Sequence, residues 1–237
     1  MEYYYTIPGN IDLEKDSLII KDFEYNHLVK VLRKKTDDEI HVTDGKRNLY
    51  LCKIIKILKQ EIVCRIIDRK FNLHEPGNNL KLFISPLRNP SRFEFAVEKA
   101  VELGVNSIHP VICDYTVNKN EFSKTKIDRI RKIIISAMGQ SQRCFLTEFF
   151  NVISFREMLN YSSSFRAKIV MYEFESSSHK LEKLKEKEIC LFIGPEGGFS
   201  ETEINTLKEN KWFSKSLGNR KLRAETAAIV SVYDILK

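Results

Sequence analysis

The sequence of 237 residues lacks the features of a membrane or secreted protein. No segment has the roughly 18 uncharged apolar residues that a membrane-spanning helix needs. The first residues, MEYYYTIPGN, include an acid at position 2 and no apolar core, unlike a secretory signal. We therefore expect no membrane association.

Cysteine and histidine are sparse and show no ligand spacing. The number of cysteines is odd, and no C-x-x-C pair occurs. Most of them lie among apolar residues, which predicts reduced, buried thiols in the cytoplasm. The five histidines are scattered without zinc-ligand spacing, so no metal site is expected. The five cysteines are Cys52, Cys64, Cys113, Cys144 and Cys190.

Basic residues outnumber acidic ones, with 39 Lys and Arg against 32 Asp and Glu, a net charge of +7. This excess favours an anionic partner, most commonly RNA or DNA. The basic residues do not gather in a tail. A lysine-rich chain with solvated charged faces would explain the composition equally well.

The first part of the chain predicts a small β-rich unit. Alternating or β-branched runs at 39–45, 48–58 and 61–69 are typical of strands, with a turn at Asp44 and Gly45. A short helix is expected at 26-NHLVKVLR-33, capped by Asn26.

The polar, turn-rich segment 71–79, with Pro76 and Gly77, predicts a domain boundary. We therefore expect one domain over residues 1–72 and a second over residues 78–237.

The second part alternates between strands and helices, which predicts an α/β fold with a mostly parallel sheet and helices on both faces. Its first helix is expected to begin with a capping box of Ser91 and Glu94 and to end at Gly104. A later helix is expected to begin near Ser123. Further strands are expected at 80–87, 107–113, 168–173, 189–194 and 215–218, with helices near 179–187, from Ser200, and at the end of the chain.

Glycine is scarce, with nine residues in all, yet three fall within 194-GPEGG-198. Glycines there permit positive φ and close approach of a ligand to the backbone. Ser200 and Glu203 then form a capping box for the next helix. The stretch is neither a P-loop nor a G-x-G-x-x-G motif. It predicts a ligand-binding turn, with a plain strand-to-helix connection as the alternative.

A second polar loop, 217-LGNRKLRAETAA-228, follows another expected strand. Three cations lie just before Glu225 and Thr226, either of which is expected to cap the last helix. Such a loop suits an anionic ligand. A solvated basic turn with Arg223 paired to Glu225 is the alternative. A third strand end, 171-MYEFE-175, would lie at the same edge of the sheet.

Together, 193-IGPEGGFSETEI-204 and 217-LGNRKLRAETAA-228 resemble the signature of the SPOUT methyltransferases. The likeness is to the RsmE branch, which methylates N3 of a uridine in small-subunit (16S) ribosomal RNA. Further matches are 26-NHLVKVLR-33, 98-EKAVELGVNSIHPV-111 and 140-QSQR-143. The resemblance covers nearly the whole chain.

The resemblance implies an N-terminal PUA-like β-barrel that binds RNA and a C-terminal SPOUT domain with a trefoil knot. Periodicity alone would not predict a knot. In this family the knot holds S-adenosyl-L-methionine, and the enzymes are homodimers.

The resemblance also implies site residues in this chain. The cofactor would be held by Tyr172, Glu173, Gly194, Pro195, Glu196, Gly198, Leu217, Gly218, Arg220, Leu222, Arg223, Thr226 and Ala227. RNA would be contacted by Lys30, Arg33, Lys34, Arg47, Arg88, Gln140 and Arg143.

The chain departs from the family pattern at several positions. Relatives usually have an acid where this chain has Gly139, and a proline near Leu146. They usually have a lysine near Arg88, and a glycine where this chain has 34-KKT-36. These departures concern RNA docking and dimer contacts.

Methylation at uridine N3 requires loss of the imide proton and stabilisation of the charge that spreads onto O2 and O4. We expect Arg223, then Arg220, to supply the positive field. Glu225 or Glu196 would act as the base or orient the substrate; alternatively, Glu196 only braces its loop and Glu225 only caps its helix. Rival functions are methylation of a ribose 2′-oxygen or another base, and a non-catalytic RNA-binding or ribosome-assembly role.

Overall fold

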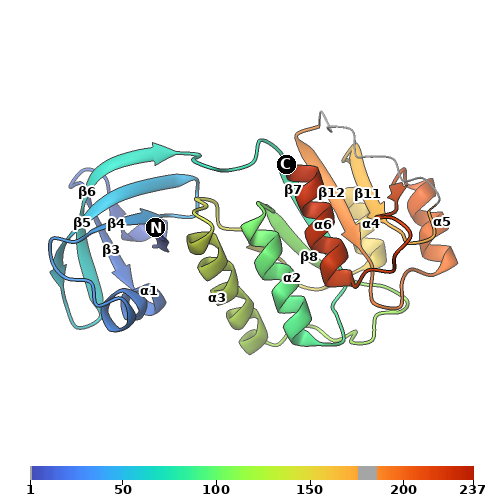
Figure 1. Ribbon diagram of the computed structural model, residues 1–237, viewed down its shortest axis with the longest axis horizontal. Coiled ribbons are helices and arrows are strands. Elements are labelled where there is room, and N and C mark those ends of the chain that lie inside the picture. The colour runs from blue at the N-terminus through green and yellow to red at the C-terminus, as the bar shows by residue number, and fades with distance from the viewer. Residues whose placement is uncertain (1, 176–185) are drawn as a thin grey trace. The chain divides into compact units, whose positions relative to one another are not determined.

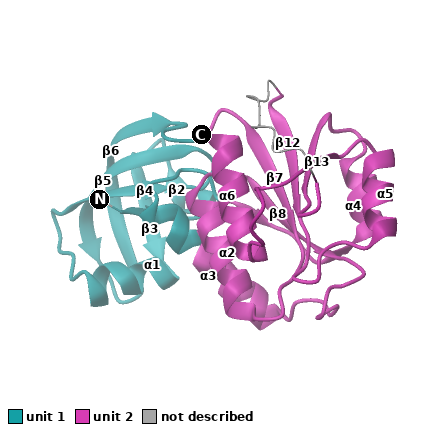
Figure 2. Cartoon of the chain, turned by 45° about the vertical axis from the view of Figure 1, so that its right-hand side comes forward, with its two compact units in different colours: residues 1–75, 135–146 teal, residues 76–134, 147–237 magenta. Residues whose placement is uncertain are grey.

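The computed structural model of the protein describes residues 2–175 and 186–237 (Figure 1). The helix expected near 179–187 falls largely outside these ranges. The chain forms two compact units, residues 1–75 with 135–146 and residues 76–134 with 147–237 (Figure 2). The sequence does not reveal that 135–146 joins the first unit. Within the described residues, no helix combines the length and apolar character needed to cross a membrane.

The first unit is built on a six-stranded sheet in the order β1-β4-β5-β6-β3-β2. All its strand pairs are antiparallel except β1 with β4. Inward-facing residues such as Leu18, Ile40 and Ile62 form its buried core. The strands are β1 Tyr3–Tyr5, β2 Ile11–Asp12, β3 Ser17–Lys21, β4 Glu39–Thr43, β5 Asn48–Ile57 and β6 Glu61–Phe71.

The helix expected at 26–33 begins earlier, as α1 (Asp22–Asn26), and continues as a π-helical turn, η2 (His27–Val31). Leu28 anchors this turn in the core. Asn26 is not the cap: it has helical φ and ψ, and its Nδ2 donates to the carbonyl of Asp22.

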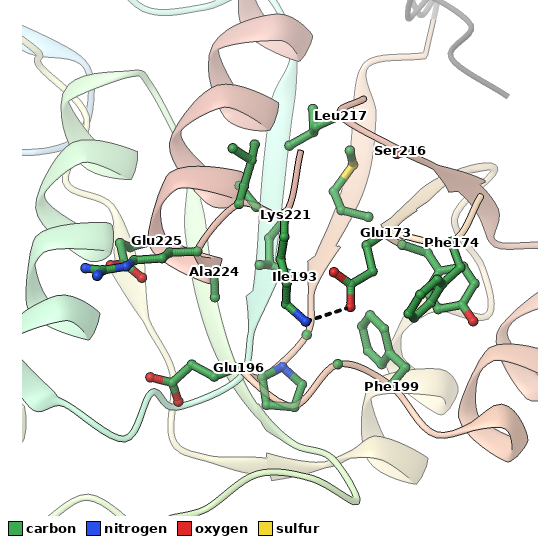
Figure 3. A pocket seen from close by; sticks show the side chains of 18 of the residues that line it. Glu173, Phe174, Ile193, Glu196, Phe199, Ser216, Leu217, Lys221, Ala224 and Glu225 are labelled. Carbon is green, nitrogen blue, oxygen red and sulfur yellow. Dashed lines mark hydrogen bonds and ion pairs between the residues drawn. The ribbon is translucent and has the colours of Figure 1, made fainter. Parts of the chain in front are cut away.

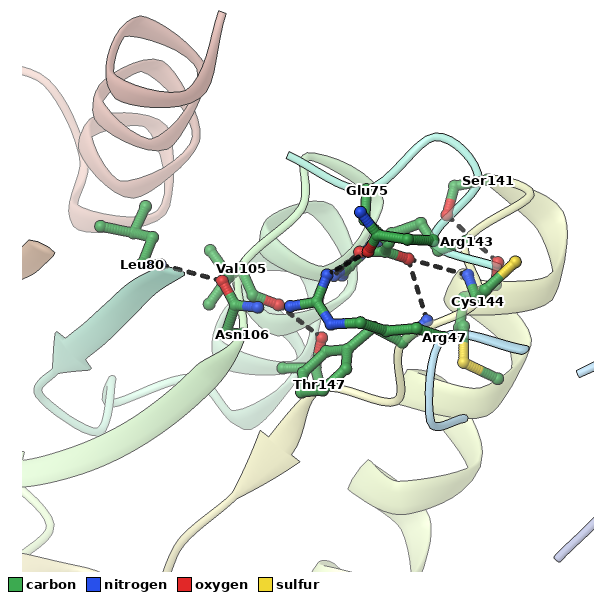
Figure 4. A network of polar contacts seen from close by, with 12 residues as sticks. Arg47, Glu75, Leu80, Val105, Asn106, Ser141, Arg143, Cys144 and Thr147 are labelled. Atoms are coloured by element: carbon green, nitrogen blue, oxygen red, sulfur yellow. Dashed lines mark hydrogen bonds and ion pairs between the residues drawn. The ribbon is translucent and has the colours of Figure 1, made fainter. Parts of the chain in front are cut away.

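Residues 141–146 are fastened to the first unit by a buried ion pair (Figure 4). The Arg143 guanidinium lies 2.9 Å from Glu75 Oε2, and their side chains are 3% and 0% exposed. Glu75 Oε1 accepts from the backbone N–H of Cys144 at 2.8 Å and of Phe145 at 2.9 Å. The prediction that Arg143 contacts RNA is therefore wrong in this fold, because Glu75 holds its guanidinium away from solvent.

Two departures from the family pattern have local reasons in this unit. A Cβ at Gly139 would lie 2.2 Å from the carbonyl oxygen of Tyr3, so the usual acid does not fit. The N–H of Leu146 donates to the carbonyl of Gly45 at 2.9 Å, a bond that proline cannot make. Close packing against β1 and the β4–β5 turn thus favours these residues.

The second unit contains a sheet in the order β10-β8-β7-β12-β11-β13, with β9 pairing to β8. Every strand pair in it is parallel, so the prediction of a mostly parallel α/β sheet is confirmed. The central strands are almost wholly buried, as expected for a sheet covered on both faces. The strands are β7 Asn79–Ile84, β8 Ser107–Ile112, β9 Glu148–Phe149, β10 Ile153–Ser154, β11 Ala167–Met171, β12 Glu188–Ile193 and β13 Phe213–Lys215.

Helices cover both faces of this sheet (Figure 1). Met158 of α4 and Leu207 of α5 pack with Phe83 and Phe192 in one core cluster. Helices α2 and α6 pack on each other, and α6 also contacts β12. The helices are α2 Pro90–Glu102, α4 Phe155–Ser162, α5 Glu201–Glu209 and α6 Ala224–Leu236, together with α3 Lys124–Gln140, whose residues from 135 onward belong to the first unit.

Two of the helices in this unit have N-terminal caps that can be compared with the predictions from the sequence. Ser200 and Glu203 form the expected capping box of α5. The predicted box of Ser91 and Glu94 is wrong: Asn89 caps α2, its Oδ1 accepting from the N–H of Ser91, with proline as the first helical residue.

Two further boundaries also differ from the prediction. Helix α6 begins after Arg223 without a side-chain cap, so neither Glu225 nor Thr226 caps it. Strand β13 ends at Lys215, where the strand expected at 215–218 was to begin. Residues 216–223 are thereby left as a loop that shapes the site.

Candidate functional site

The loops that follow β11, β12 and β13 surround a cavity of about 410 Å³ in the second unit (Figure 3). Its volume lies in the range of about 300–1,000 Å³ that is usual for small-molecule sites. Its position at the carboxyl ends of parallel strands is where open α/β sheets bind ligands. The cavity is lined by residues 171–174, 193–199, 215–218, 220–225 and 227, together with Arg92.

The loop after β12 is shaped by its glycines. Gly198 has φ +77°, its N–H donates to the carbonyl of Pro195 at 2.9 Å, and a Cβ there would meet no atom within 4 Å. A Cβ at Gly194 would lie 2.8 Å from the Phe199 ring. Gly194 therefore permits close packing against Phe199, and Gly198 leaves open space beside a tight turn.

The loop after β13 supplies apolar wall and positive charge. Gly218 has φ +105°, again with open space where a Cβ would be. Leu217 and Leu222 are half-buried on the cavity wall, whereas Arg220 and Arg223 are exposed. An apolar lining with cations at its rim suits a ligand that has both an aromatic and a polar part.

Contacts between the loop after β11 and the loop after β13 join two sides of the site. Lys221 Nζ lies 3.2 Å from Glu173 Oε1, which links the first loop to the third (Figure 3). The N–H of Tyr172 donates to the carbonyl of Lys215 at 2.8 Å. Burial lowers the pKa of Lys215, while Asp234, 3.7 Å away, opposes this effect.

The two predicted carboxylates have different surroundings. Glu196 Oε2 accepts from the backbone N–H of Arg88 at 2.9 Å, so Glu196 braces its loop. Glu225 is buried, with Oε1 3.7 Å from Arg92 Nε and Oε2 without a hydrogen-bond partner among the described residues. Its ion pair is thus formed with Arg92, and the alternative of a surface pair with Arg223 is not what the structure contains.

The cavity collects every residue expected to hold the cofactor except Thr226, which is exposed and does not line it. The four expected catalytic residues, Arg220, Arg223, Glu225 and Glu196, all lie on the wall. Sequence reasoning missed Arg92, in the first turn of α2. Arg92 lies near the start of the helix that follows β7, and β7 pairs with β12. This position near the β12 loop is the signal that could have identified it as a site residue.

The remaining residues expected to contact RNA lie outside this cavity. Lys30, Arg33, Arg88 and Gln140 are exposed, and Lys34 is half-buried. Arg47 is partly engaged, with its NH1 2.6 Å from Asn72 Oδ1 and its guanidinium 4.7 Å from the centre of the Phe145 ring.

Comparison with known proteins gives a consistent family assignment. A family model described as an RNA methyltransferase domain matches residues 74–235, and one described as an RNA methyltransferase PUA domain matches residues 20–67. Proteins named ribosomal RNA small subunit methyltransferase E resemble the chain along most of its length. That of Aquifex aeolicus is 31% identical, covering 92% of this chain and 93% of its own. That of Mesomycoplasma hyopneumoniae is 29% identical, covering 94% and 96%.

Solved structures agree with this assignment. The ribosomal RNA small subunit methyltransferase E of Neisseria gonorrhoeae, bound to S-adenosyl methionine, superposes with a TM-score of 0.84 at 26% identity, covering 98% of this chain and 95% of that one. A Legionella pneumophila protein solved with the same cofactor gives a TM-score of 0.86 at 25% identity, covering 97% and 94%. The chain therefore belongs to the RsmE family of ribosomal RNA methyltransferases, as its two glycine-containing motifs predict.

Proposed function

We propose that the protein transfers a methyl group from S-adenosyl-L-methionine to N3 of a uridine in small-subunit ribosomal RNA. The observation that carries this proposal is the cavity at the ends of β11, β12 and β13. This cavity is lined by nearly all the residues of the two glycine-containing motifs, and the chain belongs to a family of RNA methyltransferases.

The cavity residues fit the cofactor. Gly198 and Gly218 leave open space where side chains would otherwise stand, so backbone groups are accessible to a ligand. Leu217, Leu222 and Ala227 give an apolar surface for an adenine ring. When bound, the cofactor supplies an electrophilic methyl group on a sulfonium.

The chain's own charged residues would prepare the uracil. Arg223, with Arg220 second, supplies positive charge at the rim, where it would stabilise charge developing on the uracil carbonyl oxygens. Of the two carboxylates, Glu225 is the better candidate base, because Glu196 already accepts a backbone N–H.

The N3 edge of a uridine is hidden in a paired helix, so the target must be single-stranded or flipped outward. Basic residues at the surface would hold the surrounding phosphates. We assign this role to the exposed Lys30, Arg33 and Arg88 and to the half-buried Lys34 and Arg47. The exposed Gln140 would contact the RNA as an uncharged polar residue.

We also infer a trefoil knot, a homodimer and a cytoplasmic location. The knot is supported by family membership and by the path from β13 through residues 216–223 to α6, which returns to pack on α2 and β12. Exposed apolar side chains on α2 and α6, Phe95, Val230 and Tyr233, favour a second copy of the chain on these helices. All five cysteines are free and buried, which suits a reducing compartment.

The test is methylation of deproteinised small-subunit RNA, and separately of assembled subunits, with isotopically labelled cofactor and nucleoside mass spectrometry. The proposal predicts labelled 3-methyluridine from one of these substrates. Label in a ribose 2′-O-methyl nucleoside or in another base would instead identify a different methyltransferase. No label with either substrate would favour the non-catalytic role.

A further inference from the structure

The Glu225 carboxylate is a buried and incompletely paired group on the cavity wall. Glu225 is the second residue of α6, and its side chain is 9% exposed. Oε1 has only the loose contact with Arg92, and Oε2 is buried without a hydrogen-bond partner within residues 2–175 and 186–237. Because an unpartnered buried carboxylate oxygen is costly, such an oxygen on a cavity wall points to a ligand donor.

Arg92 brings the complementary group to the same wall. It lies in the first turn of α2, where its N–H donates to the carbonyl of Asn89 at 3.1 Å. Its side chain is 40% exposed and lines the cavity. Its Nε is 3.7 Å from Glu225 Oε1, which is beyond hydrogen-bond length. The pair therefore offers a charged acceptor and a charged donor side by side.

We propose that Glu225 and Arg92 together read the imide edge of the target uracil. This inference rests on the proposed function. The Glu225 carboxylate accepts from N3–H, and the Arg92 guanidinium donates to the adjacent O4. The uracil edge presents a donor between two acceptors, which this pair matches.

The same pair rejects cytosine. Cytosine N3 carries a lone pair, which would face the Glu225 carboxylate, and its N4 amine would face the Arg92 guanidinium. Both contacts set like groups against each other and leave polar groups of the site unpaired. The pair thus supplies base specificity as well as orientation.

The arrangement also gives the imide proton an acceptor. As the N3–H bond breaks, the proton forms an O–H bond with the Glu225 carboxylate. The N3 electron pair forms the bond to the methyl carbon, the carbon–sulfur bond breaks, and its electrons remain on sulfur. Arg92 balances the charge on the uracil carbonyl during this step.

The contrast with Glu196 and Glu203 supports this assignment. Glu196 accepts the N–H of Arg88, and Glu203 accepts the N–H groups of Ser200 and Asp114. One oxygen of Glu196 and both oxygens of Glu203 thus have structural partners within the chain. Glu225 makes no capping bond, although it lies in the first turn of α6.

The test uses Glu225→Gln and Arg92→Met, with Glu201→Gln and Arg156→Met as exposed controls that make the same charge changes. Turnover is measured on small-subunit RNA from a deletion strain. Binding is measured with an RNA fragment spanning the methylated nucleotide, carrying uridine or cytidine there, in the presence of S-adenosylhomocysteine. Cofactor affinity is measured separately by calorimetry.

We expect Glu225→Gln to lower kcat by about 10²–10⁴-fold, as for loss of a positioned base, with cofactor affinity retained. The wild type should bind the uridine fragment roughly ten-fold or more tightly than the cytidine fragment, and both variants should lose this preference. The controls should match the wild type.

Wild-type turnover and wild-type discrimination in Glu225→Gln would overturn the inference. Loss of cofactor affinity in both variants would also overturn it, because the pair would then hold the cofactor. If the wild type forms no 3-methyluridine, the proposed function itself fails. If the wild type forms it and both variants keep its turnover and its preference for uridine, only the role of the pair is refuted.

Discussion

Replacing Arg143 with methionine removes the guanidinium that pairs with the Glu75 carboxylate inside the first unit. The substitution keeps much of the side chain's apolar bulk but leaves a carboxylate with a fully buried side chain. Two backbone N–H groups, of Cys144 and Phe145, would remain among its donors. Breaking a buried pair on one side costs about 3–5 kcal/mol, because the remaining charge is uncompensated.

For a chain of this size, about 1 kcal/mol shifts the melting temperature by roughly 2–4 °C. The Arg143→Met variant should therefore melt roughly 6–20 °C below the wild type in a calorimetric scan. Arg131→Met, an exposed arginine of α3, is the matched control and should stay within about 0.5 kcal/mol of the wild type.

A double-mutant cycle sharpens this test. Adding Glu75→Gln to Arg143→Met removes the stranded charge, so the double variant should be more stable than the sum of the two single losses predicts. The reasoning is refuted if Arg143→Met keeps the wild-type melting temperature and instead weakens RNA binding. That outcome would restore the role that the Q-S-x-R motif suggests.

Three further predictions concern other parts of the chain. Burial raises the pKa of Glu24 from 4.5 to about 7, so the fold binds this proton more tightly than the unfolded chain does. The free energy of unfolding of the wild type should fall by about 3 kcal/mol as the pH rises from about 4.5 through 7. Urea unfolding at several pH values should show no such loss in Glu24→Gln. The same pH dependence in the variant and the wild type would contradict this prediction. Gly218→Ala places a Cβ on a backbone of φ +105°, so cofactor affinity should drop in calorimetry, with unchanged affinity as the contrary result. Arg223→Ala should lower methylation far more than cofactor affinity, and wild-type turnover with normal binding would exclude its proposed role.

Sequence reasoning succeeded where local chemistry decides the structure. The parallel sheet follows from alternating strand and helix patterns, and the α5 capping box follows from Ser200 and Glu203. The two glycine-containing motifs identified the cavity loops because their backbone demands are local.

Prediction from the sequence failed where two helix-start signals competed, or where two interacting side chains are distant in the sequence. At the start of α2, Asn89 followed by Pro90 and Ser91 followed by Glu94 both resemble helix starts, and Asn89 caps because proline suits the first helical position. Arg143 and Glu75 are 68 residues apart in the sequence. Nothing in 140-QSQR-143 indicates that this arginine pairs with a buried carboxylate. Arg92 likewise meets Glu225 only because α2 and α6 pack together.

The most direct test of the proposed function is nucleoside mass spectrometry of small-subunit ribosomal RNA from a strain lacking this protein. Loss of 3-methyluridine, restored by the wild-type gene but not by the Glu225→Gln variant, is the predicted result. Unchanged 3-methyluridine in the deletion strain would contradict the account.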